Sequence, residues 1–332
     1  MIKYLRTLSF LVLTASALAA EPKRVIVCTV TQGFRHGSIP YAETTLKKLG
    51  EESKAFTVVD FAQQPTAIIP QKPNKPADLK PDADDKTKAK YAEELKRYED
   101  AVAKWTPADD EKVKTSQAAW DAQMKASMAK LSPENLRTQK IDAVIFANTT
   151  GDLPLPDRDG FIAWITEGHG FCAMHAGGDT FHGFPGYLKM LQAEFKTHGA
   201  QVPADLVAGD KTHPANAGLG DTWNIKQEEM YEFKDGSHDR SKAHEIWFLR
   251  HHPGDKNNAG FYPVSWCRMD GKGRVFYTSL GHREDLWSDD PTLKDRVNSI
   301  EISKQYQAHI LAGIKWALGL AEGSAEANPD AK

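Results

Sequence analysis

Short apolar runs that alternate with helical patterns are the feature that most constrains how this chain folds. KRVIVCTV (23–30) contains a continuous apolar run, which is typical of a strand buried on both faces. The next segment, IPYAETTLKKLGEE (39–52), is predicted to be a helix with a proline in its first turn. Further strands are expected at 55–62, 140–152 and 169–175, with a helix at 156–168. Because strands that alternate with helices form right-handed βαβ units, the pattern predicts an α/β fold with a parallel central sheet.

The C-terminal third has a different pattern. Three closely spaced strands are expected at 244–252, 262–270 and 273–282, and because they follow one another so closely we expect them to be partly antiparallel. The segment 301–320 carries apolar residues at helical spacing. It is predicted to close the domain as an amphipathic helix.

The composition changes between Pro65 and Gln139. Residues 70–85 are proline-rich and charged, which is typical of an extended segment. The stretches 86–105 and 108–131 have the charge spacing of two surface helices. We predict a charged helical insertion here, and its functional alternative is a partner-docking arm or a lid. The expected organisation is a signal peptide at 1–19, one α/β domain at 20–64 and 140–321, the insertion at 65–139, and a disordered tail at 322–332.

The N-terminus has the order of a secretory signal peptide. Lys3 and Arg6 precede an apolar stretch that ends in the small-residue box Ala17-Leu18-Ala19. The alternative is a short membrane anchor, but the run is too short to span a bilayer of about 30 Å as a helix. No other segment is apolar enough to cross a membrane. We therefore expect an exported protein, periplasmic or secreted, with no membrane association after signal cleavage.

Three cysteines are too few to build the fold from disulfides. Cys28, Cys172 and Cys267 each lie in an expected strand. Free buried thiols are the expected state. A single Cys28–Cys172 bridge is the alternative in an oxidising compartment.

Charge and missing motifs exclude several classes of function. The formal net charge is −3 and the pI is about 6.5, which argues against a nucleic-acid surface. No G-x-G-x-x-G follows the first strand, so neither a nicotinamide nor a flavin cofactor is expected. H-E-x-x-H and paired C-x-x-C motifs are also missing. A single divalent metal held by dispersed histidines and a carboxylate stays open.

Histidines follow several of the expected strands. His36 comes after the first strand, His175 directly ends the fourth, and His282 ends a late strand. Ligands bind beyond the carboxyl ends of the strands in an open parallel sheet, so we expect these side chains to converge at one edge. Arg35 and Thr149 also follow strands there, and both, together with His36, are expected to contact substrate.

His175 stands at a strand-to-turn corner where many α/β enzymes place a nucleophile. We expect it to act as an acid–base group or a metal ligand, with His282 as the complementary acid or second ligand. Asp179 or Glu229 is expected to orient it, since such a histidine needs a partner that fixes its tautomer. Glu228 and Glu232, in the same KQEEMYEF segment as Glu229, are expected to be solvent-exposed.

Five ordered motifs make the chain resemble the ThuA-like (trehalose-utilisation) family. They are TVTQGFRHGSI, GFCAMHAGGDTF, EFKTHG, THPANAGLGDTWNIKQEEMYEF and PVSWCRMDGKGRVFYTSLGH, and the resemblance covers residues 24–320 apart from the helical block. It implies a flavodoxin-like three-layer sandwich similar to class I glutamine amidotransferases. Those enzymes have a cysteine nucleophile at the corner where this chain has His175, so amidotransferase chemistry is not implied.

The resemblance also implies site residues and a class of function. The family pattern carries over onto His36, His175, Asp179, His198, His213, Glu229, Tyr231 and His282, with His198 and Tyr231 expected to bind substrate. Tyr262 departs from it, because the family often has a histidine there, and the site is altered if that histidine shapes it. The family is linked to carbohydrate use, so the expected partner is a small sugar. An enzyme that hydrolyses, eliminates from or isomerises a sugar or keto-sugar is one interpretation, and a non-catalytic carbohydrate-binding or accessory protein is the other.

Overall fold

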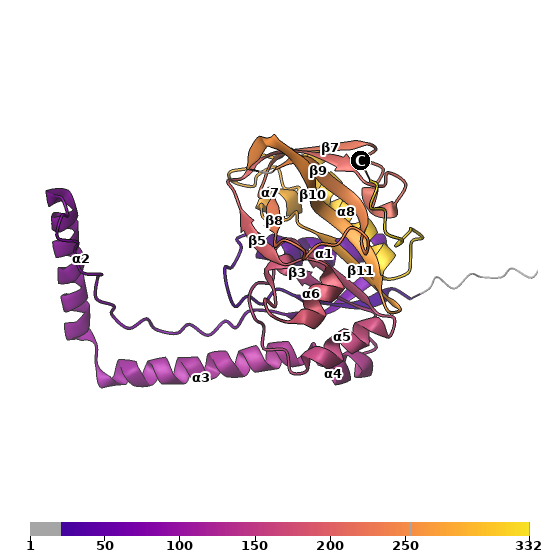
Figure 1. The fold of residues 1–332 in the computed structure, drawn as a ribbon. Helices are drawn as coiled ribbons and strands as arrows, with labels where there is room; N and C mark the ends of the chain where they lie inside the picture. The colour runs from indigo at the N-terminus through magenta and orange to yellow at the C-terminus, as the bar shows by residue number, and fades with distance from the viewer. Residues whose placement is uncertain (1–20, 253, 332) are drawn as a thin grey trace, which may run out of the picture.

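The computed structural model describes residues 21–252 and 254–331, and its centre is a nine-stranded sheet (Figure 1). The signal peptide expected at 1–19 lies outside these residues. Within the described residues, no helix is both long and apolar enough to span a bilayer.

One half of the sheet is parallel, as the alternation of strands and helices predicts. In spatial order its strands are β2 (Phe56–Ala62), β1 (Lys23–Cys28), β3 (Ala143–Ala147), β4 (Gly170–Met174) and β11 (Gly273–Thr278). Strands β3 and β4 are buried at every position, which explains their uninterrupted apolar sequence. The carboxyl ends of these five strands form one edge of the sheet.

The other half continues the sheet with antiparallel strands. Its order outward from β11 is β10 (Asp255–Asp270), β9 (His244–His252), β6 (Val202–Ala208) and β7 (Thr222–Glu228). A separate two-stranded ribbon pairs β5 (Phe195–His198) with β8 (Tyr231–Phe233). The late strands are thus partly antiparallel, as expected, whereas β5 to β8 have no counterpart among the strands predicted above.

Helices cover both faces of the sheet and complete the predicted three-layer sandwich. On one face lie α1 (Ile39–Ser53), α7 (Glu284–Trp287) and α8 (Ile300–Ala317). On the other face lie α4 (Pro133–Thr138), α5 (Arg158–Thr166), α6 (Pro185–Leu191) and the end of α3 (Pro107–Ala129). Two short 3₁₀ turns, η1 (His175–Asp179) and η2 (Pro214–Asn216), complete the elements of the body.

The three cysteines are distributed over both faces of the sheet, which determines whether they can form a disulfide bond. All three are free and buried. Cys28 packs in the core beneath α5 and α6, and Cys172 packs in the core beneath α8. Because successive side chains of a strand point to opposite faces, the two thiols are separated by the sheet itself. The alternative of a Cys28–Cys172 bridge is therefore wrong.

An arm projects from the body and contains α2 (Asp85–Lys104) together with most of α3 (Figure 1). No residue of α2 is buried. The end of the expected insertion behaves differently, because Met124, Met128, Leu131 and Leu136 are all buried in the core. The boundary expected at Gln139 therefore differs from the structure, in which residues 124–138 belong to the body.

The C-terminal segment is ordered on the body, so the expectation of a disordered tail at 322–332 is wrong for its described residues. The Asn328 side chain pairs with both backbone groups of Glu245, accepting from its N–H at 2.6 Å and donating to its carbonyl at 3.1 Å. A further contact is the Arg240 guanidinium, which donates to the carbonyl of Ala331. These bonds to the backbone hold a segment whose composition offers little apolar surface.

Candidate functional site

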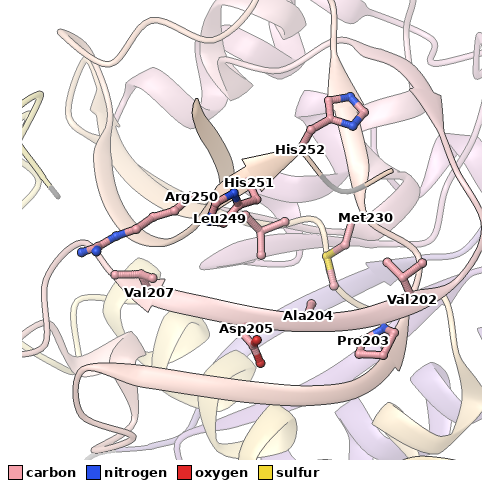
Figure 2. Close-up of a pocket in the computed structure, with 10 residues that line it drawn as sticks. All are labelled: Val202, Pro203, Ala204, Asp205, Val207, Met230, Leu249, Arg250, His251 and His252. Atoms are coloured by element: carbon pink, nitrogen blue, oxygen red, sulfur yellow. The ribbon is translucent and has the colours of Figure 1, made fainter. Parts of the chain in front are cut away.

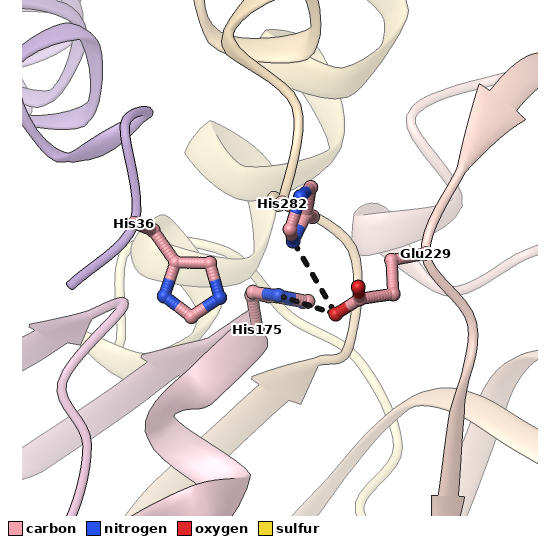
Figure 3. A group of neighbouring side chains, drawn as sticks. All are labelled: His36, His175, Glu229 and His282. Atoms are coloured by element: carbon pink, nitrogen blue, oxygen red, sulfur yellow. Dashed lines mark ion pairs between the residues drawn. The ribbon is translucent and has the colours of Figure 1, made fainter. Parts of the chain in front are cut away.

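Four side chains meet at the carboxyl edge of the parallel strands (Figure 3). His36 follows β1, His175 follows β4, His282 follows β11, and Glu229 follows β7. One nitrogen or oxygen atom from each lies within 4.8 Å of the corresponding atoms of the others. His175 is fully buried, His36 and Glu229 are nearly so, and His282 is partly open. The expected convergence of three histidines and a carboxylate is thus present, and these four residues are called the cluster below.

The corner that carries His175 is sterically demanding. Its φ of +46° lies in the left-handed region, which a residue with a Cβ occupies only when its surroundings enforce it. The turn behind it packs tightly, since a Cβ on Gly178 would lie 2.6 Å from the hydroxyl oxygen of Tyr277. His175 Nδ1 lies 2.8 Å from the carbonyl of Ser279 and therefore carries the proton. Its Nε2 is left as an acceptor, 3.1 Å from the hydroxyl of Tyr231.

Glu229 connects the cluster to a more exposed histidine. Its Oε2 lies 3.3 Å from His282 Nδ1 and 3.5 Å from His175 Nε2. Its Oε1 lies 3.0 Å from Nδ1 of His198, which is half-exposed. That Nδ1 also lies 2.9 Å from the carbonyl of Gly199. Because both of its neighbours are acceptors, Nδ1 of His198 carries a proton, and Nε2 is the ring nitrogen left without either contact.

Burial and mutual repulsion set the charge states of the histidines. Burial, followed by the neighbouring histidines, lowers the pKa of His36 to about 3. Burial also lowers the pKa of His175 despite the opposing effect of Glu229. Burial alone would lower the pKa of His282, but the attraction of Glu229 outweighs it and the pKa is raised. Burial would raise the pKa of Glu229, and the histidines instead hold it well below its usual range. His36 and His175 are therefore neutral at neutral pH, beside an ionised carboxylate.

Glu228 supports the cluster through the backbone. Its position in the chain predicted a solvent-exposed side chain, and that prediction is wrong. Its carboxylate is fully buried and accepts the backbone N–H groups of Gly281, His282 and Arg283 at 2.9, 2.6 and 3.2 Å. Burial raises its pKa to about 7, against the opposing effect of these N–H groups. Glu228 therefore fixes the loop that presents His282. Glu232, also expected in solvent, is partly buried and lies 2.9 Å from His252.

Asp179 does not orient His175, so that alternative is wrong and Glu229 is the carboxylate beside the ring. Asp179 lies 2.6 Å from Nε2 of His182, whose Nδ1 lies 3.1 Å from Glu194. The 3₁₀ turn that starts at His175 points the Asp179 side chain toward this other histidine.

Arg35 and Thr149 have structural partners in place of the expected contact with a ligand. The Arg35 guanidinium donates to the carbonyl of Thr29 at 3.0 Å, within its own loop. Thr149 is fully buried, and its hydroxyl lies 2.8 Å from that of Thr180. Thr149 thus joins two loops and is shielded from any substrate.

The donor set of the cluster fits a divalent transition metal. Three imidazoles and one carboxylate are ligands that Zn²⁺ and similar ions accept, at about 2.0–2.2 Å from each donor atom. Four donors placed tetrahedrally at that distance lie about 3.4 Å from one another, so the widest pair, within 4.8 Å here, would draw together by up to about 1.4 Å around an ion. Nδ1 of His36 is buried without a hydrogen-bond partner among the described residues. Nδ1 of His282 lies 3.3 Å from Glu229 Oε2 but outside hydrogen-bond geometry. These orphaned nitrogens support the fit.

Two cavities lie near the cluster. One of about 400 Å³ opens where β6 and β9 diverge, with Met230 and Leu249 in its wall (Figure 2). The other, of about 570 Å³, lies between the β5–β8 ribbon and the first half of β10, and Tyr231 lines it. Of these two cavities, the second shares Tyr231 with the immediate surroundings of His175.

Comparison with known proteins agrees with this architecture. The structure is similar to that of a ThuA-like protein from Parabacteroides merdae ATCC 43184, with 17% identity, 90% coverage of each chain and a TM-score of 0.55. A ThuA-like protein from Bacteroides uniformis ATCC 8492 gives 16% identity, a TM-score of 0.55, and coverage of 96% of this chain and 99% of that one. No curated protein matches the chain.

The sequence model of the ThuA family, described as trehalose utilisation, matches residues 87–317. The match starts within α2, so it takes in the arm helices and leaves out the loop that carries His36. It includes the other three cluster residues and confirms the resemblance found in the sequence motifs. The chain belongs to the ThuA family.

Proposed function

We propose that this chain is an exported enzyme that acts on a sugar or keto-sugar glycoside, with the cluster as its reacting centre. The observation that carries the proposal is the convergence of His36, His175, Glu229 and His282 on one point at the carboxyl edge of the sheet. A carbohydrate-binding protein without catalysis has no need for three rigidly held imidazoles beside a buried carboxylate. The ThuA membership supports a substrate from carbohydrate metabolism.

The cluster residues have separable tasks in this proposal. His36, His175, His282 and Glu229 would hold a single divalent ion, and such an ion would supply Lewis-acid polarisation of a carbonyl or hydroxyl oxygen of the sugar. His198 accepts a proton at Nε2, since its Nδ1 proton is held by Glu229 and Gly199. The Tyr231 hydroxyl stands beside His175 and donates to a substrate oxygen once that oxygen enters the cluster.

An exposed aromatic ring marks the mouth of the site. Phe34 is 67% exposed, and its ring lies 4.9 Å from that of His36 between centroids. Its backbone is fixed, because the Thr150 hydroxyl donates to the Phe34 carbonyl at 2.9 Å and accepts from the N–H of Gly33. An exposed ring on a fixed backbone beside a polar centre suits the apolar C–H face of a pyranose.

The test is incubation of the purified protein with a panel of glycosides and 3-keto-glycosides, with and without a chelator. We expect turnover of at least one sugar, loss of that turnover with the chelator, and recovery when Zn²⁺ or Mn²⁺ is added back. Turnover that resists the chelator would remove the metal from the proposal. Saturable binding of the same sugars without any product would instead establish the carbohydrate-binding alternative.

A further inference from the structure

Asn148 is a fully buried residue at the carboxyl end of β3, and it lies in the middle of the parallel half of the sheet. β3 pairs with β1 on one side and with β4 on the other, and these are the strands that lead to His36 and His175. The φ of Asn148 is +56°, in the left-handed region that asparagine adopts more readily than most residues with a Cβ. The chain therefore turns at Asn148, at the edge of the sheet where the cluster lies.

The side chain of Asn148 connects the loops that carry two of the cluster histidines. Its Nδ2 donates to the hydroxyl of Ser38 at 2.7 Å, and Ser38 is two residues after His36. The same Nδ2 donates to the carbonyl of Gly281 at 3.0 Å, and Gly281 directly precedes His282. One amide group therefore joins the loop after β1 to the loop after β11.

The backbone of Asn148 adds a contact next to the third histidine. Its N–H donates to the carbonyl of Met174 at 3.3 Å, and Met174 directly precedes His175. Asn148 thus bonds to the chain beside each of the three histidines. The separations between their rings consequently depend on where this one residue is held.

The surrounding hydrogen bonds fix the orientation of the Asn148 amide. The Ser38 hydroxyl donates to the Gly281 carbonyl at 3.1 Å, so its oxygen is left as the acceptor toward Asn148. The Gly281 carbonyl accepts a further bond from Nε1 of Trp287 at 2.8 Å. Both hydrogens of Nδ2 therefore face acceptors, and Oδ1 is buried without a hydrogen-bond partner among the described residues. A carboxylate at this position would have no donor for either acceptor.

We propose that Asn148 is a positioning residue that sets the separations of the three imidazole rings in Figure 3. It supplies no ligand atom to the cluster and acts through the backbone beside His36, His175 and His282. The inference rests on the proposed function for the divalent ion that these rings would hold. Because such an ion accepts each donor only within a narrow range of distances, its affinity depends on groups that orient the ligands.

Two substitutions remove the amide donors in different ways. Asn148→Asp keeps the size of the side chain and replaces both donors with acceptors. Asn148→Gly adds no charge, and glycine adopts the left-handed backbone without strain. Asn216→Asp is the matched control, because Asn216 is a buried asparagine whose side chain bonds to both backbone groups of Gly220.

The first measurement records the histidine ring signals of the metal-free protein by NMR with isotope-labelled histidine. We expect the signals of His36, His175 and His282 to move in both Asn148 variants and to keep their positions in Asn216→Asp. A new charge shifts such signals by itself, so the neutral Asn148→Gly decides. Loss of a contact that only stabilises the fold would lower the melting temperature and leave the ring signals in place.

The second measurement is calorimetry with Zn²⁺ on the full chain and the same variants. We expect the Kd of Zn²⁺ to rise about 10–100-fold in both Asn148 variants and to stay unchanged in the control. Ring signals that stay in place in a folded Asn148→Gly, or a wild-type Kd for Zn²⁺ that both Asn148 variants retain, would overturn the positioning role. Ring signals that move in a protein that binds no Zn²⁺ would support it and remove the metal from the proposed function.

Discussion

Glu228 and Glu229 are adjacent in the chain, yet their carboxylates hold the same histidine in different ways. Glu228 accepts the backbone N–H of His282 at 2.6 Å, whereas Oε2 of Glu229 lies 3.3 Å from the His282 ring. One carboxylate therefore fixes the loop, and the other faces the imidazole. The position of His282 therefore depends on one contact at its backbone and on another at its imidazole ring.

Glu228→Gln tests the loop contact. The amide keeps an acceptor oxygen but turns an NH₂ group toward backbone N–H groups, which shifts the loop. We expect the fold to persist and the affinity for Zn²⁺, measured by calorimetry, to fall about 10–100-fold, as for other groups that orient metal ligands. Glu301→Gln, at an exposed position on α8, is the control. Unchanged affinity in Glu228→Gln would show that the loop holds His282 without this carboxylate.

Alanine substitutions of the cluster histidines and of Cys172 are expected to have opposite effects on turnover. His175→Ala and His282→Ala should each remove most of the turnover, because each takes away one proposed ligand of the divalent ion. Cys172→Ala should keep the rate, since its thiol is buried in the core and burial raises its pKa. Assays on 3-keto-glycosides with folding checked by circular dichroism decide between them. Loss on Cys172→Ala alone, with an intact fold, would restore a cysteine nucleophile.

Phe34→Ala should weaken sugar binding without affecting the metal. Removing the exposed ring takes away one stacking face, so we expect the Kd for a bound glycoside to rise about tenfold. Zn²⁺ affinity should be unchanged because Phe34 supplies no ligand atom. Phe34→Tyr preserves the ring and serves as the matched variant. An equal Kd for Phe34→Ala and wild type would exclude Phe34 from the binding surface.

The burial of His309 predicts that acid destabilises the fold. The side chain is fully buried, and burial lowers its pKa to about 4 from the ordinary histidine value of 6.5. The unfolded chain binds the proton first as the pH falls, so stability from this residue is complete above pH 6.5 and is lost toward pH 4. The loss amounts to about 3 kcal/mol.

Urea unfolding of wild type and His309→Gln at pH 7 and pH 4.5 measures this effect. Glutamine does not titrate, so the wild type should lose more of its free energy of unfolding between the two pH values than the variant does. Equal losses would show that His309 is not a source of the pH dependence.

The arm should be dispensable for folding. Thr66 N–H and Ala67 N–H both donate to Gln123 Oε1, at 2.8 and 3.2 Å, so the chain enters and leaves the arm at neighbouring points. Replacing residues 68–122 with a short Gly-Ser linker should leave the melting temperature of the body nearly unchanged. Met128→Ala, in the buried part of α3, should by contrast cost about 2–5 kcal/mol. Global unfolding of the deletion variant would place the arm within the folding unit.

The parallel half of the sheet could be predicted because its strands are buried on both faces. β3 and β4 are uninterrupted runs of apolar residues, and such short runs are typical of strands that are buried on both faces. That sheet then brings His36, His175 and His282 to one edge, so three of the four cluster residues followed from strand order. β6 and β7 were not predicted, because in each of them only two fully buried apolar residues alternate with exposed neighbours, which is a short signal in a polar segment.

Glu228 could not be predicted, since a bulge decides its direction. In β7, Trp223 and Ile225 are buried and their neighbours are exposed, so strict alternation would place Glu228 in solvent. The register shifts near the end of the β6–β7 ladder, and Glu228 turns inward. Asn298 stabilises the bulge by accepting the N–H groups of Lys226 and Gln227. A contact of this kind, between segments 71 residues apart, leaves no local pattern.

The projecting arm also determines how the protein behaves in solution. A dense body with a thin extension experiences more friction than a sphere of the same mass, and Figure 1 shows α3 leading away from the sheet with α2 at its far end. A gel-filtration column calibrated with globular standards will therefore overstate the mass of this 36.8-kDa chain. An early elution volume is consequently a measure of shape, and counting subunits requires light scattering or sedimentation equilibrium.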